Sequence, residues 1–435
     1  MEKTWEKIKL LFTLPDLRMK LIITLILLVL IRILAHIPLP GVDLAALRDF
    51  FQGNQIFGLL NMFSGSTMEN FSIILMGVGP YITASIIMQL LQYVIPQLEA
   101  LAKEGEYGQR KLNQYTRYLT VPLAAIQAYA MIRVLERAGA AQGGLGINLA
   151  GMDLVIAIIT VTAGTVLLMW LGELISESGI GNGISLIIAM GIIAGLPTMA
   201  RNTMALITQG GLDSGKLTGL IIFLVVTIAV VAFVVLINEG TRNIPVSYAK
   251  RVRGMRMYGG ADTHLPLKVN QAGVIPIIFA LAFLLLPGTL AQFFQGSSVS
   301  WIASGATYIA NIFQNNLFYG VTYFVLVVAF TYFYTAVVFN PEQIAENLQK
   351  QGGFIPGIRP GSQTISYLKK ILNRVTLTGA VFLGFIAVLP FIVQAITGIT
   401  TLVLGGTGIL IIISVILETS RQIDSMLATR SYDNF

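Results

Sequence analysis

The chain has 435 residues, of which 55% are hydrophobic and only 11% are charged, and its mean hydropathy is +0.77. Soluble globular proteins carry about 25% charged residues, so this composition predicts a protein embedded in a lipid bilayer. With no cysteine and only two histidines, disulfides and thiolate metal sites are excluded, and a histidine metal site is not expected.

Ten apolar stretches predict membrane-spanning helices, because a helix needs about 20 residues to cross the hydrocarbon core. Residues 1–19, which precede them, form a charged amphipathic segment without the pattern of a cleavable leader. In chain order the ten predicted spans are 20–37, 71–95, 118–137, 153–175, 183–200, 217–237, 271–292, 317–339, 375–397 and 402–418.

Basic residues predict the orientation of these spans. If the N-terminus is cytoplasmic, the inside segments hold 22 of the 28 Lys and Arg residues and the outside segments hold 5, while Arg32 lies in the first span. The positive-inside rule then places both the N-terminal segment and the tail, 421–435, in the cytoplasm. Arg32 is close enough to the outer end of its helix to snorkel to the surface.

Two connections are too long for simple turns, and both are predicted to project into the cytoplasm. Segment 240–270 is basic, and segment 340–374 contains the decapeptide GGFIPGIRPG at 352–361. Four glycines and two prolines in ten residues rule out a helix or an inner strand. The decapeptide is therefore predicted to be an exposed loop that presents Arg359.

A short repeat predicts two related halves. The second span contains Gly77-Val78-x-Pro80, and the seventh contains Gly273-Val274-x-Pro276. Because each half would have five spans, the halves at 20–200 and 217–420 would be inverted, with 201–216 as an external linker. Helix breaks at matching positions point to a transport pathway, although Gly and Pro also occur in ordinary apolar helices.

The chemistry of energy coupling is missing from the sequence. GGLDSGKL at 210–217 resembles a phosphate-binding loop, but Leu217 stands where Ser or Thr should hold the metal ion. Spans two and five to nine contain no Asp, Glu, Lys or Arg, which counts against ion-coupled transport of a small solute. That class of transporter remains the alternative to a pathway sealed by aliphatic side chains.

Several long motifs resemble the SecY family of protein-conducting channels. The resemblance runs from about residue 14 to about residue 427, and it is carried by KEGEYGQRKLNQYTRYLT (103–120), WLGELISESGIGNGISLII (170–188), IPVSYAKR (244–251), HLPLKVNQAGVIPIIFA (264–280) and NPEQIAENLQKQGGFIPGIRPG (340–361). It implies an all-α membrane protein with ten helices in two pseudo-symmetric inverted halves.

The resemblance also implies a function. The chain would be a channel without enzymatic activity or cofactor, located in the bacterial plasma membrane. It would conduct unfolded secretory polypeptides that carry signal peptides, and it would release membrane segments sideways into lipid. The implied partners are SecE, SecG, the SecA ATPase and the ribosome.

The family's functional positions map onto residues of this chain. They imply a hydrophobic pore ring of Val78, Ile82, Ile184, Ile188, Ile278 and Ile411. Taken singly, each of these residues is more typical of packing against protein or lipid. The implied lateral gate opens between spans two and three on one side and seven and eight on the other, and includes Ile86, Gln89 and Asn182. The two polar gate residues could instead be ordinary helix-packing residues.

Residues 55–70 correspond to the family's plug, with Asn61, Met62, Phe63, Ser64 and Gly65 in the matching motif. By composition alone this segment is more typical of an extracytoplasmic surface loop.

The long cytoplasmic loops correspond to docking sites for the motor or the ribosome, and Arg359 is the implied tip residue. Lys250, Arg251, Arg253 and Arg256 would add attraction to RNA or acidic protein. The alternative for each of these residues is that its charge only serves the positive-inside rule.

Overall fold

The structure is a computed structural model that describes residues 14–40, 47, 67–141, 151–208, 214–248, 251–253, 256–258, 262–295, 299–397 and 401–432. Its first helices are α2 (Pro15–Leu34), α5 (Gly79–Val94), α6 (Pro96–Lys103), α7 (Glu106–Ala141), α8 (Met152–Ser178) and α9 (Gly183–Thr208). The later ones are α10 (Ser214–Glu239), α11 (Ile275–Phe294), α12 (Ser300–Gln314), α13 (Asn316–Val338), α14 (Pro341–Lys350), α15 (Ser362–Thr397) and α16 (Thr401–Tyr432).

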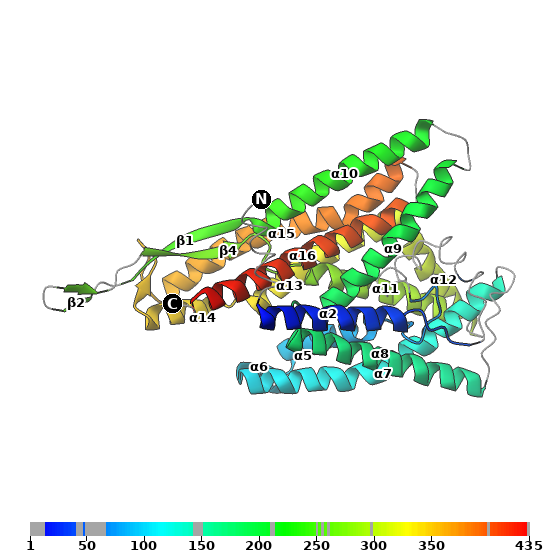
Figure 1. The fold of residues 1–435 in the computed structure, drawn as a ribbon, viewed down its shortest axis with the longest axis horizontal. Helices are drawn as coiled ribbons and strands as arrows, with labels where there is room; N and C mark the ends of the chain where they lie inside the picture. Colours follow the sequence, from blue (N-terminus) through cyan, green and yellow to red (C-terminus); the bar gives the residue numbers. More distant parts are fainter. Residues whose placement is uncertain are drawn as a thin grey trace.

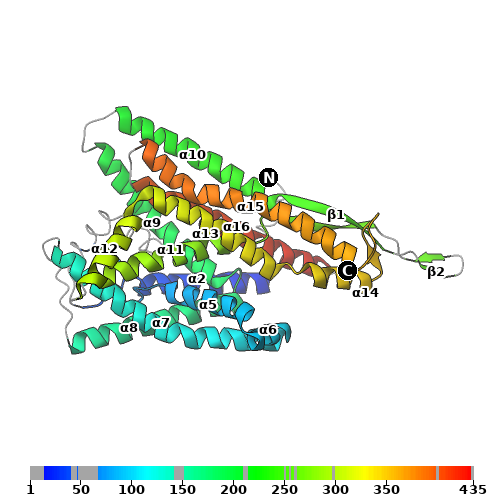
Figure 2. The ribbon, with the colours of Figure 1, turned by 180° about the vertical axis from the view of Figure 1, so that it is seen from behind.

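Most of these helices lie side by side along the long axis of the molecule (Figure 1). Strands project from one end, and the C-terminal end of α16 lies toward that end (Figure 1). The helix α12 lies at the opposite end, as the reverse view also shows (Figure 2). The molecule therefore has one end with a small sheet and one end built from helix termini and their connections.

The two Gly-Val-x-Pro motifs lie at helix starts, not within continuous spans. Gly77 and Gly273 have φ angles of +54° and +64°, and Pro80 and Pro276 follow in the first turns of α5 and α11. Glycine adopts this left-handed conformation at little cost, and proline suits the first helical turn because its missing N–H has no partner there. The predicted span 71–95 is therefore helical only from residue 79, and turns precede it.

Two helices are longer than the membrane spans predicted for them. The helices α7 and α15 have 36 residues each, whereas the predictions were 118–137 and 375–397. At 1.5 Å per residue such a helix is about 54 Å long, which exceeds the hydrocarbon thickness of about 30 Å. Their polar N-terminal parts extend beyond the apolar segment, which a search for apolar runs cannot detect.

Within the described residues, four helical stretches are long and apolar enough to cross a membrane: Glu106–Glu136, Met152–Ser178, Leu317–Lys350 and Ser362–Val393. Shorter apolar helical stretches are Gly183–Pro197, Val225–Glu239 and Ile275–Leu284. This supports a multi-pass membrane protein, while the count of ten stays a prediction.

The two long connections contain a sheet that the sequence did not predict. Strands β1 (Thr241–Tyr248), β4 (Asp262–Lys268) and β5 (Gly353–Phe354) form an antiparallel sheet in the order β4-β1-β5. The short strand β5 lies at the edge, so the decapeptide supplies no inner strand. The fold is therefore mostly helical, and not all-α as predicted. The strands are short and interrupted by Pro245 and Pro266, which hides them in the sequence.

A small core attaches this sheet to the helices. Ile244 of β1 and Leu267 of β4 pack with Ala345 of α14, Leu368 of α15 and Ile355. Asn340 is the N-cap of α14, and its Oδ1 accepts hydrogen bonds from the main-chain N–H groups two and three residues later, at 3.0 and 3.3 Å. The sheet and the decapeptide are thus held to α14 and α15.

Candidate functional site

The six residues predicted to form the pore ring lie in or against one apolar cluster inside the helix bundle. Four of them are buried, and Ile82 and Ile184 are partly buried and pack against the same cluster. They come from α5 and its N-cap, α9, α11 and α16, which are far apart in the sequence. Such side chains offer no hydrogen bonds to water or ions, so together they could form a seal.

Val274 belongs to the same cluster, although it is not among the predicted ring residues. The main-chain N–H of Ile82 donates to the carbonyl of Val78 at 3.0 Å, and that of Ile278 donates to the carbonyl of Val274 at 3.3 Å. Val274 and Ile278 therefore occupy the same positions on α11 as Val78 and Ile82 on α5. The sequence signal that could have found Val274 was the Gly-Val-x-Pro repeat.

The plug residues Asn61, Met62, Phe63, Ser64 and Gly65 lie outside the described residues. The end of the predicted plug segment, from Thr67 onward, is described. Met68 is buried in a second apolar cluster with residues of α7 and α8, such as Ile132 and Val161. The described end of the segment thus packs against these two helices.

The helices predicted to border the lateral gate are packed against each other. The helix α11 packs on both α5 and α7. Between α5 and α13, the rings of Tyr93 and Phe333 meet edge-on with centroids 5.2 Å apart. Ile86 of α5 is buried in the same cluster as the ring residues. The seam between these helices is closed in this structure.

The two polar residues predicted for the gate, Gln89 and Asn182, each make a hydrogen bond within their own segment and none with each other. Gln89 is part-buried on α5, where its Nε2 donates to Ser85 Oγ at 3.2 Å and its Oε1 has no partner. Asn182 is exposed before α9, and its Oδ1 accepts from the main-chain N–H of Ser185 at 3.2 Å. Asn182 thus caps the N-terminus of α9, and the buried Oε1 of Gln89 accepts no hydrogen bond from the described part of the chain.

A polar junction lies where the sheet meets the helix bundle. The Nδ2 of Asn270, just before α11, donates to Asn238 Oδ1 at 2.8 Å, and Asn238 Nδ2 lies 3.4 Å from Ser414 Oγ on α16. All three side chains are buried. Ser414 is three residues after Ile411, so the junction is about one helical turn from a predicted ring residue.

Charged groups surround this junction. Arg421 of α16 donates to Glu239 Oε1 at 2.8 Å. Burial lowers the pKa of Lys268 in β4 below its usual value, and the positive charge of Arg421 lowers it further, while Glu239 and Glu418 oppose the shift. Two cations, Arg421 and Lys268, and two anions, Glu239 and Glu418, thus lie near one another where α10, α16 and the sheet meet.

The Arg359 side chain is exposed on a tightly built turn. Ile355, four residues earlier, is buried in the small core, and Ile358 packs against that core. Thr364 Oγ1 donates to the carbonyl of Arg359 at 3.0 Å. The turn therefore fixes the backbone at Arg359, and the exposed guanidinium that extends from it can pair with a carboxylate or phosphate.

The other predicted docking residues lie in or beside a hairpin that projects beyond the sheet (Figure 1). Its strands are β2 (Arg251–Arg253) and β3 (Arg256–Tyr258), and Arg253 pairs with Arg256 across the ladder. Lys250 lies outside the described residues, and for the three arginines only the backbone is described. The pairing concentrates arginines on a short projection.

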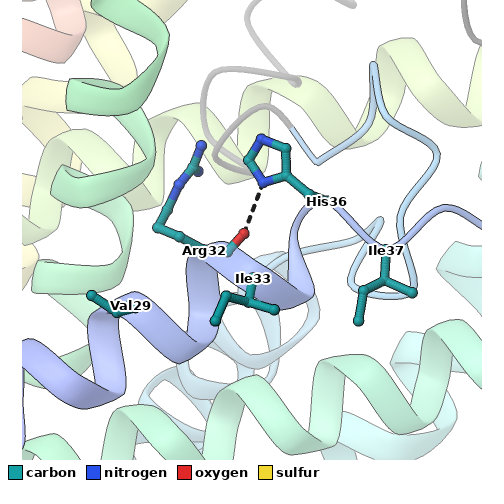
Figure 3. A pocket seen from close by; sticks show the side chains of 5 residues that line it. All are labelled: Val29, Arg32, Ile33, His36 and Ile37. Carbon is teal, nitrogen blue, oxygen red and sulfur yellow. Dashed lines mark hydrogen bonds between the residues drawn. The ribbon is translucent and has the colours of Figure 1, made fainter.

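An open groove of about 540 Å³ lies at the C-terminal end of α2 (Figure 3). It is lined by Val29, Arg32, Ile33, His36 and Ile37. His36 Nδ1 donates to the carbonyl of Arg32 at 2.8 Å, since that oxygen can only accept. Arg32 lies in the last turn of α2 and is half-buried, a position compatible with the predicted snorkelling.

Comparison with known proteins decides the family. The sequence pattern of the SecY family matches residues 72–420. A protein translocase subunit SecY of Streptomyces galbus is 45% identical over 98% of both chains. The chain belongs to the SecY family. Among solved structures, one described as a protein-conducting channel has a TM-score of 0.64 at 21% identity, covering 93% of this chain and 91% of that one.

A second neighbour has the same fold as this SecY-family chain. It is described as Sec61 in a canine ribosome–channel complex, with a TM-score of 0.63, 21% identity and the same coverage of 93% and 91%. The predicted family is confirmed, and at this identity the neighbours show the fold. Within the described residues of this SecY-family member, no group of three or more His, Asp or Glu side chains could hold a metal ion.

Proposed function

We propose that the chain is the central subunit of a protein translocation channel that conducts unfolded secretory polypeptides and releases membrane segments into lipid. It is a channel subunit and not an enzyme. Membership of the SecY family supports this assignment, and the small-solute transporter has no support in the fold or the family. The observation that carries the mechanism is the aliphatic cluster that α5, α9, α11 and α16 share.

In this mechanism the aliphatic cluster is the constriction of the pore. Branched side chains close around a polypeptide of any sequence, because they make no specific hydrogen bonds with it. They exclude water and ions when no polypeptide is present. The plug, with Phe63 at its centre, would cover this ring in the resting state.

The architecture proposed for the whole chain has ten spans in two inverted halves, 20–200 and 217–420, joined by an external linker at 201–216. The matching helix starts of α5 and α11 support this symmetry. The strong excess of basic residues in the predicted inside segments supports a cytoplasmic location for 1–19, 240–270, 340–374 and 421–435. The membrane is the plasma membrane of a bacterium, as the bacterial relative suggests.

The lateral gate would open along the seam between α5 and α7 on one side and α11 and α13 on the other. A signal sequence gains about 0.3–0.6 kcal/mol for each leucine that enters lipid. Ten such residues supply several kcal/mol, enough to offset the lost contact between Tyr93 and Phe333. Gln89 would supply a polar group at this seam.

The cytoplasmic sheet would be the docking surface for the SecA ATPase or the ribosome, with SecE and SecG as the small membrane subunits. Arg359 and the hairpin arginines present positive charge that pairs with carboxylates or RNA phosphates. The packed turn under Arg359 supports this role, because it fixes the backbone from which the exposed guanidinium extends.

The test reconstitutes the chain with SecE and SecG in vesicles, adds SecA, ATP and a secretory precursor, and measures the precursor protected from protease. Arg359→Glu is compared with Lys370→Glu, which makes the same charge change on an exposed residue of α15. We expect ATP-dependent protection with the original chain and with Lys370→Glu, and its loss with Arg359→Glu.

Each result separates two parts of the proposal. Equal activity of Arg359→Glu and the original chain would reject the docking role of Arg359 and leave the channel intact. If the original chain never protects precursor, the translocation function itself is wrong, and solute uptake by the same vesicles becomes the relevant assay.

A further inference from the structure

The helix α12 is too short to cross a membrane and connects two helices that flank the predicted gate. Its 15 residues span about 22 Å at 1.5 Å per residue, less than the hydrocarbon core of about 30 Å. It contains no charged residue. It packs on both α11 and α13, at the end of the molecule opposite the sheet (Figures 1 and 2).

One face of α12 packs against the protein. Ala306 and Ala310 are buried, and Phe313 packs against the main apolar cluster. These residues recur at helical spacing, so they form one stripe along the helix. The corner to α13 is fixed as well, because Asn315 Oδ1 accepts from the main-chain N–H of Leu317 at 3.0 Å.

The opposite face of α12 carries two large exposed aromatic side chains. Trp301 is 76% exposed and Tyr308 is 69% exposed, and they are seven residues apart, so both lie on the same side of the helix. Tryptophan and tyrosine are enriched where a membrane meets water, because each ring is apolar with one polar group that stays hydrated.

The exposed face is continuous with apolar surface on the neighbouring helices. Phe294 near the end of α11 is exposed, and so are Leu317 and Val321 at the start of α13. These residues flank α12 on the two helices that it connects. In a SecY-family chain such a surface borders lipid, and an uncharged helix between its two parts has no electrostatic reason to leave the membrane.

We propose that α12 lies parallel to the membrane plane in the lipid headgroup and glycerol layer, with Trp301 and Tyr308 facing the lipid. Phospholipid is the partner, and because α12 has no charge the contact does not depend on anionic lipid. This contact holds the ends of α11 and α13 at a fixed depth, while their other ends connect to the cytoplasmic sheet. It does not depend on the proposed translocation function.

The chain has three tryptophans, so depth can be measured by fluorescence. The variant Trp5→Phe/Trp170→Phe leaves only Trp301. It is reconstituted in phosphatidylcholine vesicles with bromine at acyl positions 6,7 or 11,12. We expect at least twofold stronger quenching by the shallow bromines, and no change when a third of the lipid is replaced by phosphatidylglycerol.

The matched control leaves only Trp170, which is also exposed but lies on the membrane-crossing helix α8. Trp170 is five residues from the middle of α8, about 7.5 Å along the axis, so the deep bromines should quench it more strongly. This control shows that, in the same preparation, the two brominated lipids distinguish a shallow tryptophan from a deep one.

A third variant tests the direction of the helix. It carries Tyr308→Trp with the other three tryptophans changed to Phe. If α12 lies in the membrane plane, tryptophan at 308 has the same depth as tryptophan at 301. If α12 runs along the membrane normal, the two differ by about 10 Å, and the proposal is wrong. Quenching of Trp301 by aqueous acrylamide but not by brominated lipid would also overturn the proposal and place this face in water. Quenching by neither acrylamide nor brominated lipid would overturn it in favour of a protein partner on this face.

Discussion

The guanidinium of Arg421 donates to the carboxylate of Glu239 from both Nη2 and Nε, at 2.8 and 3.2 Å. Its Nη2 also donates to the main-chain carbonyl of Asn238. Arg421 lies ten residues after Ile411 on α16, and Glu239 ends α10 just before β1 begins. The contact thus fixes the start of strand β1 to a helix that carries a predicted ring residue.

Substituting Arg421→Gln should lower the free energy of unfolding by about 0.5–1 kcal/mol, because both charged side chains are partly exposed. Glu239→Gln should have a smaller effect, since it leaves the hydrogen bond from Arg421 to Asn238. Thermal unfolding in detergent measures both variants. An equal loss in the two would mean that the contact to the main chain contributes nothing.

The buried pair Asn270 and Asn238 should be more sensitive. In Asn270→Leu, the Oδ1 of Asn238 loses its 2.8 Å donor while it stays buried, which costs about 1–3 kcal/mol. The double variant Asn238→Leu/Asn270→Leu should recover part of this loss, because the Asn238 acceptor is removed together with its donor, although Ser414 Oγ then loses its contact with Asn238. Strictly additive losses, measured by unfolding in detergent, would show that the two amides do not interact.

Replacing glycine by alanine should have opposite effects on stability just before α11, at Gly273, and inside α11, at Gly288. No atom lies within 4 Å of a Cβ placed on Gly273 or Gly288. Gly273 has a φ of +64°, so Gly273→Ala should destabilise the protein by about 1–2 kcal/mol. Gly288 lies inside α11, and Gly288→Ala should stabilise it by about 0.5–1 kcal/mol. Two changes of the same sign in the unfolding temperature would contradict this account.

The symmetry of α5 and α11 predicts that Val274 belongs to the pore seal. Val274→Asn should raise the ion leak of reconstituted vesicles severalfold, as Val78→Asn should, because a polar side chain lets water enter the constriction. The control Leu284→Asn places the same group on α11, about 15 Å further along the helix. A leak equal in Val274→Asn and Leu284→Asn would assign Val274 to packing alone.

Lys268 should lose its proton at a lower pH than an ordinary lysine. Its folded pKa lies below the usual 10.5, chiefly because of burial, so its charge is lost before that pH is reached. Arg421→Gln should raise this pKa, since it removes a nearby positive charge and frees Glu239 to attract the proton. Methyl-¹³C NMR of the reductively methylated protein measures both titrations. A Lys268 midpoint at or above 10.5 would contradict the buried position.

Much of the site could be predicted from the sequence because it is encoded locally. Apolar runs identified the membrane-spanning character, and the motif at 340–361 identified an exposed turn with Arg359 at its tip. The sequence could not show the sheet, because β1 and β5 are about a hundred residues apart and β5 has only two residues. The Gly-Val-x-Pro repeat points to Val274 as the counterpart of Val78, but the sequence could not show that both are buried in one cluster, since that depends on which helices meet.

By itself the sequence indicated a membrane protein, identified the family and predicted the side on which the basic residues gather, because composition, motifs and charge need no knowledge of contacts. Only the tertiary structure decided that the Gly-Val-x-Pro motifs begin helices. It also brought the aliphatic residues of α5, α9, α11 and α16 into one cluster and joined the sheet to the bundle through Asn238 and Asn270. The cluster and the Asn238–Asn270 contact depend on packing and hydrogen bonds between distant segments, which no local pattern records.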